Sequence, residues 1–259
     1  MFGESEYPRN SLISLIIEGA GLSYGIVQPG DDGTGDMGVL RPVDFADGKI
    51  KTDSIKYIDR SLGDGFKKTE LNGNELLITV RGTTGITALT DSRFKGMNVT
   101  RGIAVIRYDK KKVDSIYLNE YIKMEKSQQY IKEHTRGATL QQINLSELRD
   151  LEIVIPPLPL QRVFATFVEH VDQQKQTVQQ SLEKLELLKK ALMQEYFGWL
   201  PQSPSVTAPS GREPLCGGKA KASLLEGGGT ALAVTEGVGQ QSLEKLELMK
   251  KALMQEYFG

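Results

Sequence analysis

The sequence predicts an α+β fold in which a mixed globular domain, residues 1–157, is followed by a long coiled-coil helix, residues 158–198. Short apolar segments separated by turn residues predict strands and small helices in the domain. Pro156, Pro157 and Pro159 then allow a helix to begin, because proline fits the first turn of a helix and no later turn. Beyond them, apolar residues recur every seven positions, which is typical of a coiled coil.

The elements of the domain follow from local patterns. Residues 75–84 form an apolar strand that runs into a glycine turn, and residues 102–108 alternate as a second strand. Residues 118–133 are expected to form a surface helix, and residues 148–155 to end in a final buried strand. Turns are predicted at Pro29-Gly30, Asp32-Gly33, Asp47-Gly48 and Asn72-Gly73.

The helical stripe is long enough to extend beyond the domain. About 35 residues at about 1.5 Å each reach about 50 Å, whereas a domain of about 150 residues has a radius of gyration of only about 15 Å. We therefore expect the chain to self-associate through this stripe, although a helix packed on its own domain remains the alternative. The candidate residues of the stripe are Phe164, Val171, Val178, Leu185, Leu188 and Leu192.

The end of this helix occurs twice. Residues 179–198 and 240–259 are identical except that Leu188 is matched by Met249, as a gene duplication or an altered reading frame would produce. Residues 199–239 lack any helical or strand period, which predicts a flexible linker. The copy could fold back on residues 179–198, but we expect the longer pairing between two chains to prevail and the tail to be mobile, dispensable or weakly inhibitory.

Composition excludes several classes of protein. The chain is 39% hydrophobic and 25% charged with a net charge of −1, which excludes a collagen-like, disordered or globally basic chain. No apolar stretch is long enough to span a membrane, and the first residues are acidic where a signal peptide is basic, so we expect a cytoplasmic protein. With one cysteine and two histidines, no metal site is expected.

No catalytic motif stands out. Gly19-Ala20-Gly21 lacks the third glycine and the following helix of a dinucleotide-binding turn. The chain contains neither a phosphate-binding GxxxxGK[ST] loop nor a GxSxG nucleophile turn. We therefore expect no catalytic residues and no cofactor in this chain.

Polar, glycine-containing loops at the strand ends are the remaining candidate site. Residues 51–150 carry an excess of basic side chains, so a local basic face is expected there. Arginine can bind guanine, asparagine or glutamine can bind adenine, and threonine can bind a base or a phosphate oxygen. The candidate DNA contacts are Arg81, Thr83, Thr84, Asn98, Arg101, Arg136, Thr139, Gln141, Gln142 and Asn144, with Tyr24 and Gln28 as weaker candidates.

Five segments resemble the specificity subunit of type I restriction-modification systems. They are GLSYGIVQPG at 21–30, ELLITVRGTTG at 75–85, GMNVTRGIAVIR at 96–107, GATLQQINLSELRDLEIVIPPLPLQR at 137–162 and EKLELLKKALMQEYFG at 183–198. The last two are the most specific, because there a target-recognition domain ends in a strand, crosses a proline bridge and enters the long helix. Leu160 departs from the acidic residue usual before Gln161.

The resemblance implies that DNA recognition and catalysis belong to different subunits. The domain would read one half of a bipartite sequence in double-stranded DNA, and the helix would act as a spacer. Modification subunits would bind S-adenosylmethionine and transfer the methyl group, and a restriction subunit would use ATP. Such subunits usually carry two recognition domains and two long helices, so this chain resembles a half-size form with one of each.

Two other functions remain open on the sequence. The chain could be a truncated coiled-coil relic that no longer binds DNA and competes for modification subunits. It could also be an enzyme in its own right, which would need a site that the motifs do not indicate. Loss of DNA retention in the presence of modification subunits would favour the first, and methyl transfer or cleavage by the chain alone would favour the second.

Overall fold

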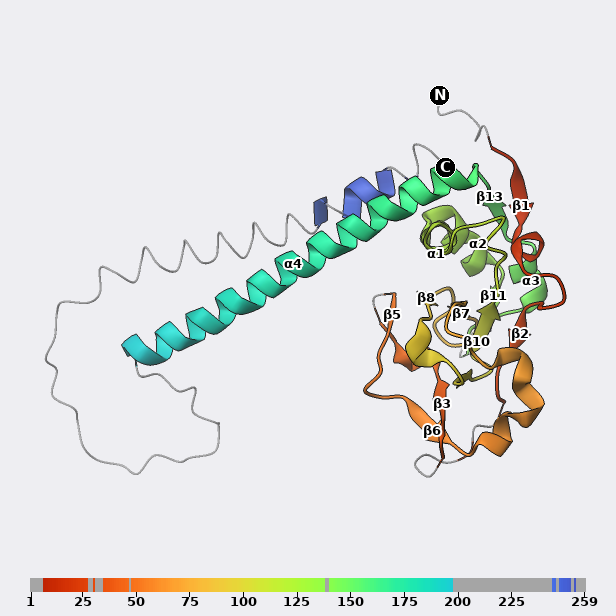
Figure 1. Ribbon diagram of the computed structural model, residues 1–259, viewed down its shortest axis with the longest axis horizontal. Helices are drawn as coiled ribbons and strands as arrows, with labels where there is room; N and C mark the ends of the chain where they lie inside the picture. Colours follow the sequence, from red (N-terminus) through yellow and green to blue (C-terminus); the bar gives the residue numbers. More distant parts are fainter. Residues whose placement is uncertain are drawn as a thin grey trace, which may run out of the picture. The chain divides into compact units, whose positions relative to one another are not determined.

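The computed structural model describes residues 7–27, 30, 35–46, 48–137, 140–197, 244–245, 247–252 and 254. The chain divides into two compact units, Met1–Val168 with Lys251–Gly259, and Glu169–Lys250. Helix α4 belongs to both units, and each unit is described by itself (Figure 1).

The first unit contains a four-stranded antiparallel sheet in the order β2-β10-β7-β8. Its strands are β2 (Ser23–Tyr24), β7 (Leu76–Thr79), β8 (Thr87–Leu89) and β10 (Ile103–Ile106). β7 and β10 are buried along their whole length, so both faces of the sheet are covered. The strands expected within residues 75–84 and 102–108 are confirmed, although both are shorter than predicted.

Smaller sheets and short 3-10 helices complete the strand-rich part. The order β6-β3-β9 joins β3 (Met37–Leu40), β6 (Lys56–Ile58) and β9 (Asn98–Val99), and β3 and β9 are parallel. The two-stranded pairs are β1 (Arg9–Ser11) with β13 (Glu152–Val154), β4 (Phe45–Ala46) with β5 (Lys49–Ile50), and β11 (Thr135–Arg136) with β12 (Gln142–Ile143). The 3-10 helices are η1 (Leu12–Leu15), η2 (Pro42–Asp44), η3 (Arg60–Thr69) and η4 (Ser92–Phe94).

The predicted turns are partly within the described residues. Gly73 has a φ of +86°, a left-handed conformation that favours glycine, so the Asn72-Gly73 turn is confirmed. Gly30 and Gly48 also have positive φ angles. The other halves of those turns, Pro29 and Asp47, and the Asp32-Gly33 turn lie outside the described residues.

The predicted surface helix over 118–133 is wrong in two respects. The structure has two helices there, α1 (Ser115–Lys123) and α2 (Glu125–Glu133), because Met124 between them is extended, with a φ of −60° and a ψ of 148°. Helix α1 is mostly buried, with Tyr117 and Leu118 fully inside the core. The Asp114 carboxylate caps it by accepting hydrogen bonds from the Ile116 and Tyr117 backbone amides.

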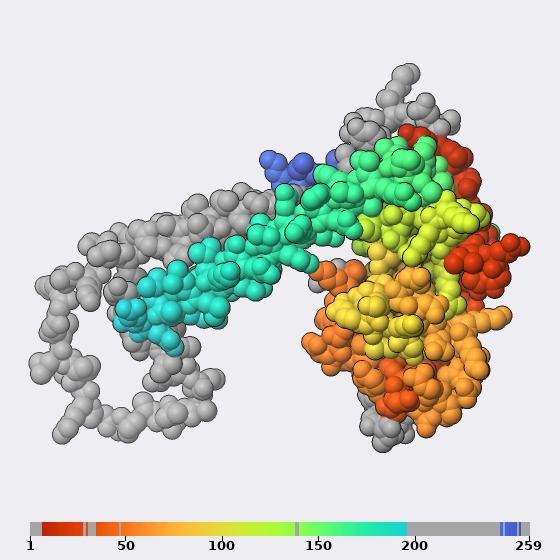
Figure 2. Space-filling model, in the orientation of Figure 1, coloured from red at the N-terminus to blue at the C-terminus, as the bar shows by residue number. Residues whose placement is uncertain are grey.

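The prediction that residues 148–155 end in a buried strand is confirmed. This segment contains the end of a short helix, α3 (Leu145–Arg149), and then β13. β13 pairs with β1, with Arg9 opposite Val154, and Figure 2 shows the N-terminal residues in red packed against this green part of the chain. The strand immediately before the proline bridge is therefore held on one side by the N-terminal strand.

The start of α4 (Leu158–Phe197) is fastened to the domain by a buried amide. Gln161 is fully buried. Its Oε1 accepts a hydrogen bond from the Asp114 backbone amide at 2.8 Å, and its Nε2 donates to the carbonyl oxygens of Pro156 at 2.8 Å and Lys112 at 3.3 Å. Leu160, the unusual residue of the bridge, is partly buried against the core, so it contributes apolar contact at this junction.

We expect Gln161→Ala to lower the free energy of unfolding by about 1 to 3 kcal/mol, because it leaves buried backbone polar groups without partners. Chemical denaturation followed by circular dichroism would measure this. Gln173→Ala, at an exposed position of the same helix, is the matched control and should change the stability little. Equal stabilities for the two variants would contradict the role given to Gln161.

The stripe on α4 is buried at its start and exposed further along. Phe164 is buried in the core of the first unit, where its ring stands edge-on to Tyr117 with the centroids 6.1 Å apart. The prediction that Phe164 is an oligomerisation contact is thus corrected, because the first turns of the helix pack on their own domain. Further along, Leu185, Leu188 and Leu192 are exposed by 41%, 57% and 43%.

No helix among the described residues is long and apolar enough to cross a membrane.

The described part of the copied helix end is helical, and Figure 1 draws it in blue. Within the second unit, Lys175 forms an ion pair with Glu247. Within the first unit, Met254 is 3% exposed and belongs to the same core cluster as Phe164 and Val168. The mobility expected for this tail stays a prediction. The expected linker, residues 199–239, lies outside the described part of the chain.

Candidate nucleic-acid interface

Three of the loops predicted to contact DNA meet in the first unit. The Gly82 amide donates to the Gln141 carbonyl at 2.9 Å, which ties the β7–β8 loop to the β11–β12 hairpin. The Val80 amide donates to the Gly102 carbonyl at 2.8 Å, which ties the same strand end to the turn before β10. Segments that are distant in sequence are thus joined by their backbones.

Arg81 and Gln142 are bonded to each other. The Arg81 Nε donates to the Gln142 Oε1 at 2.9 Å, and the two residues also form an isolated β-bridge. The Arg81 Nη1 is buried and has no hydrogen-bond partner among the described residues. The arrangement holds one guanidinium edge against the hairpin.

Arg101 is an exposed cation of this region whose backbone is held by neighbouring segments. Its backbone amide donates to the Ile26 carbonyl at 2.9 Å, and the neighbouring Thr100 forms a parallel bridge with Ile26. The Arg101 side chain is exposed, and within the described residues it makes no ion pair or hydrogen bond. A guanidinium held at its base in this way can bind a phosphate or a guanine edge.

Asn98 is a correction to the predicted contacts. It is 1% exposed, and its Oδ1 accepts hydrogen bonds from the Thr69 hydroxyl at 2.8 Å and the Val99 amide at 2.9 Å. Its Nδ2 donates to the Phe66 carbonyl at 3.2 Å. The side-chain amide of Asn98 forms its hydrogen bonds within the fold, where it joins β9 to η3, so Asn98 is a structural residue.

The hairpin carries the remaining candidates. Arg136 is 78% exposed and lies 3.8 Å from Glu147, a distance at which an exposed ion pair contributes little. Thr83, Gln141 and Asn144 are exposed, whereas Thr84 shares a hydrogen bond of 3.1 Å with Thr135. Thr139 and Gln28 lie outside the described residues.

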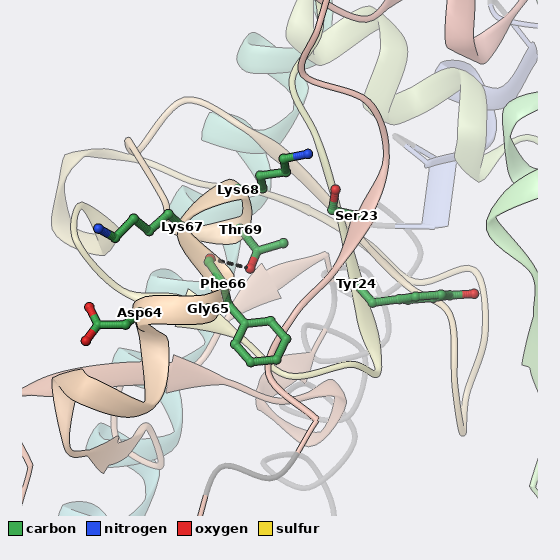
Figure 3. Close-up of a pocket in the computed structure, with 8 residues that line it drawn as sticks. All are labelled: Ser23, Tyr24, Asp64, Gly65, Phe66, Lys67, Lys68 and Thr69. Carbon is green, nitrogen blue, oxygen red and sulfur yellow. Dashed lines mark hydrogen bonds between the residues drawn. The ribbon is translucent and has the colours of Figure 1, made fainter.

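Tyr24 connects the hairpin region to an open hollow of about 400 Å³. Its hydroxyl accepts a hydrogen bond from the Leu145 amide at 3.3 Å, next to Asn144. The lining residues are Ser23, Tyr24, Asp64, Gly65, Phe66, Lys67, Lys68 and Thr69. In Figure 3, Lys68 extends on the side of Ser23, whereas Lys67 and Asp64 extend to the other side of the η3 backbone.

Lys67 and Lys68 are candidates that the sequence reasoning missed. Their placement depends on η3, whose first residues are capped by the Asp59 carboxylate accepting from the Ser61 amide at 2.8 Å. Its end is held by Arg107, which donates to the carbonyls of Lys68 at 2.6 Å and Glu70 at 2.5 Å. Adjacent lysines after two glycines were the available signal, since lysine is a common phosphate contact.

Glu75 supports the same end of η3 from inside the fold. Its side chain is fully buried and accepts hydrogen bonds from three consecutive backbone amides, of Asn72, Gly73 and Asn74, at 2.8 to 3.0 Å. It also receives the Arg107 Nε at 3.4 Å. Burial raises the pKa of Glu75, but the hydrogen bonds outweigh burial and hold the pKa below its ordinary value.

This lowered pKa predicts a pH-dependent contribution to stability. Because the folded-state pKa lies below the unfolded one, the contribution is present above about pH 4.5 and is lost as the pH falls through the folded-state value. We expect Glu75→Gln to be less stable at neutral pH and to lose less stability than the wild type on acidification. Denaturation midpoints across this pH range would measure both. Glu169→Gln, at an exposed position, should follow the wild type throughout.

Comparison with known proteins shows what this architecture is. Residues 34–187 match the type I restriction modification DNA specificity domain. The type I restriction enzyme EcoBI specificity subunit of Escherichia coli is 21% identical over 215 residues, covering 79% of this chain and 44% of that protein. The chain therefore spans less than half the length of this relative.

One of the similar solved structures shares the fold at a TM-score above 0.5. A chain in a structure of the type I restriction-modification system has a TM-score of 0.55 at 18% identity, covering 74% of this chain and 45% of that one. The S subunit from M. genitalium has a TM-score of 0.48 at 17% identity, covering 76% of this chain and 47% of that one.

A strand-rich domain that leads through a proline bridge into a long helix defines the class of restriction-system specificity subunits, whose domain is a target-recognition domain. The chain belongs to the family of type I restriction modification DNA specificity domains. The resemblance inferred from the sequence is thereby confirmed.

Proposed function

We propose that this chain is the DNA sequence-recognition subunit of a type I restriction-modification complex, and that its first unit reads one half of a bipartite site. The observation that carries the proposal is the meeting of three polar loops beside Tyr24, with Arg101 exposed among them. Such loops carry side chains that can reach base edges, while their backbones are fixed by the sheet.

The contacts divide by chemistry. Arg101 is suited to a guanine edge or a phosphate, and the exposed Gln141 and Asn144 are suited to adenine. Lys67 and Lys68 supply sequence-independent contacts to the phosphate backbone, which makes binding depend on salt concentration. With a net charge of −1, the chain needs partner subunits to add further phosphate contacts around the duplex.

The chemistry belongs to partners in this proposal. Modification subunits bind S-adenosylmethionine and methylate the DNA, a restriction subunit uses ATP and cleaves it, and this chain positions them without catalysing either step. Because one recognition domain reads one half-site, two chains pair through the exposed part of α4, which acts as the spacer. The expected target is a palindrome with a non-specific central spacer.

Expression of the chain with a cognate modification subunit, followed by genome-wide mapping of methylated bases, tests this function. The expected result is a bipartite palindromic motif that disappears when either protein is omitted. A stable complex that methylates no motif would contradict DNA recognition and favour a competitor of modification subunits. Methylation by this chain alone would contradict the assignment of chemistry to the partners.

A further inference from the structure

The chain carries one docking face on α4 and two copies of the segment that fits it. Within the first unit, Phe164 and Val168 share a core cluster with Met254, and within the second unit Lys175 pairs with Glu247. We call this part of α4, residues 164–175, the docking face. The two copies are EKLELLKKALM at residues 183–193 and EKLELMKKALM at residues 244–254. We call the second copy the cap segment.

The cap segment runs antiparallel to α4. Glu247 pairs with Lys175, and Met254, one heptad later, lies in the cluster that contains Val168, one heptad earlier. Glu247, Lys250 and Met254 have the i, i+3, i+7 spacing of one helix face, and the last two are only 8% and 3% exposed. Leu248 and Met249, off this face, are 65% and 50% exposed.

The matching residues within α4 are uncovered. Glu186, Lys189 and Met193 correspond to Glu247, Lys250 and Met254. All three are exposed, Met193 by 42%. The same sequence is therefore seated on the docking face in one copy and bare in the other. Residues 183–193 of a second chain have the side chains needed to occupy the same face.

Substitution of one copy for the other defines a closed dimer. Lys175 would pair with Glu186 of the partner subunit, and the partner's Lys175 would pair with Glu186. Both contacts follow from a single antiparallel pairing of two α4 helices, with a two-fold axis between residues 180 and 181. An isologous interface of this kind is complete with two chains and leaves no open end.

We propose that the cap segment, residues 244–254, occupies the docking face and excludes residues 183–193 of a second chain from it. The cap segment thereby raises the protein concentration at which two chains pair. Each chain makes one such contact in either state, so the contact energies nearly cancel. A tethered segment then has the advantage, since its effective concentration is in the millimolar range for short linkers and somewhat lower for longer ones.

The proposal rests on the self-association part of the proposed function and is independent of DNA recognition. It also differs from the expectation from sequence, in which pairing between chains prevails over the tail. The occupant of the docking face is either the chain's own cap segment or a second copy, and the two exclude each other.

Matched substitutions in the full-length chain separate the two states. Met254→Asp places a charge in the buried seat of the cap segment, and Met193→Asp makes the same change in the uncovered copy. Sedimentation velocity across a concentration series should show Met254→Asp dimerising at least tenfold more tightly than the wild type, and Met193→Asp remaining a monomer. The variant with both substitutions should also be a monomer. Circular dichroism would confirm that each variant is folded.

Charge exchange tests the register and provides a second route if Met254→Asp does not fold. Lys175→Glu with Glu247→Lys restores only the pairing within one chain and should give a monomer. Lys175→Glu with Glu186→Lys restores only the pairing between chains and should give a dimer.

If wild-type and Met254→Asp chains dimerise equally, the proposal that the cap segment competes with a second chain is wrong, whereas self-association still holds. Monomers in every folded variant would overturn self-association itself. In neither case would DNA recognition by the first unit be tested, so that part of the proposed function is judged separately by the methylation map.

Discussion

Replacing both Leu185 and Leu192 by glutamate should abolish methylation of the bipartite site. These side chains are 41% and 43% exposed on the stripe of α4, where two chains pair in the proposed assembly. Four glutamates would then lie along one interface, two from each chain and those at position 192 facing Glu169 of the other chain, at a desolvation cost that a helix pair of this size does not offset. Sedimentation at tens of micromolar and genome-wide methylation mapping would measure pairing and target recognition separately.

Leu187→Glu is the control for this variant. Leu187 is 66% exposed and lies two residues from Leu185, which turns it away from the stripe, so pairing and methylation should be retained. A double variant that sediments as a monomer and still methylates the same palindrome would contradict the requirement for two chains.

Arg101→Ala should weaken DNA binding by about 1 to 3 kcal/mol, which corresponds to about 5- to 150-fold in affinity. If Arg101 binds a guanine, the methylated motif should also lose its preference at one position. If it binds a phosphate, affinity should fall for all sequences. The slope of the logarithm of affinity against the logarithm of salt concentration should then decrease in magnitude by about one. Titration of labelled duplexes at several salt concentrations, with the modification subunit present, distinguishes these results.

Arg93→Ala provides the matched control for Arg101→Ala. Arg93 is also an exposed arginine, but its guanidinium is held by the Asp91 carboxylate, with the closest contact 2.7 Å long. Its removal should leave affinity and motif nearly unchanged. Equal effects of the two substitutions would show that only overall charge matters and would contradict the placement of the reading loops.

The sequence predicted best where local chemistry decides the structure. The proline bridge and the heptad spacing placed the start of the long helix, and the structure begins it at Leu158. The break at Met124 carries no proline or glycine, so it arises from packing that a local pattern does not contain. For the same reason, residues 118–133 were predicted as a surface helix although α1 is mostly buried.

The candidate site was predicted in part, for a related reason. Residue type indicated which loops are polar, and three of these loops meet in the fold. Burial could not be read from residue type, so Asn98 was assigned to the surface although its amide is enclosed. Lys67 and Lys68 were missed because η3 brings them beside β2, a neighbour more than forty residues earlier in the chain.

The way the loops are joined has a consequence for how such a protein changes its target in evolution. The links from Gly82 to Gln141 and from Val80 to Gly102 are made by backbone atoms. They leave the exposed Gln141 side chain free to vary, whereas Gly82, with a φ of +82°, and Gly102, where a Cβ would lie 2.7 Å from Pro42, favour glycine. If the proposed function is correct, single mutations at the exposed Arg101, Gln141 or Asn144 should alter specificity at little cost to the fold. Arg81 and Gln142 are the exception, because their side chains form a hydrogen bond with each other. We expect these two positions to covary among related proteins.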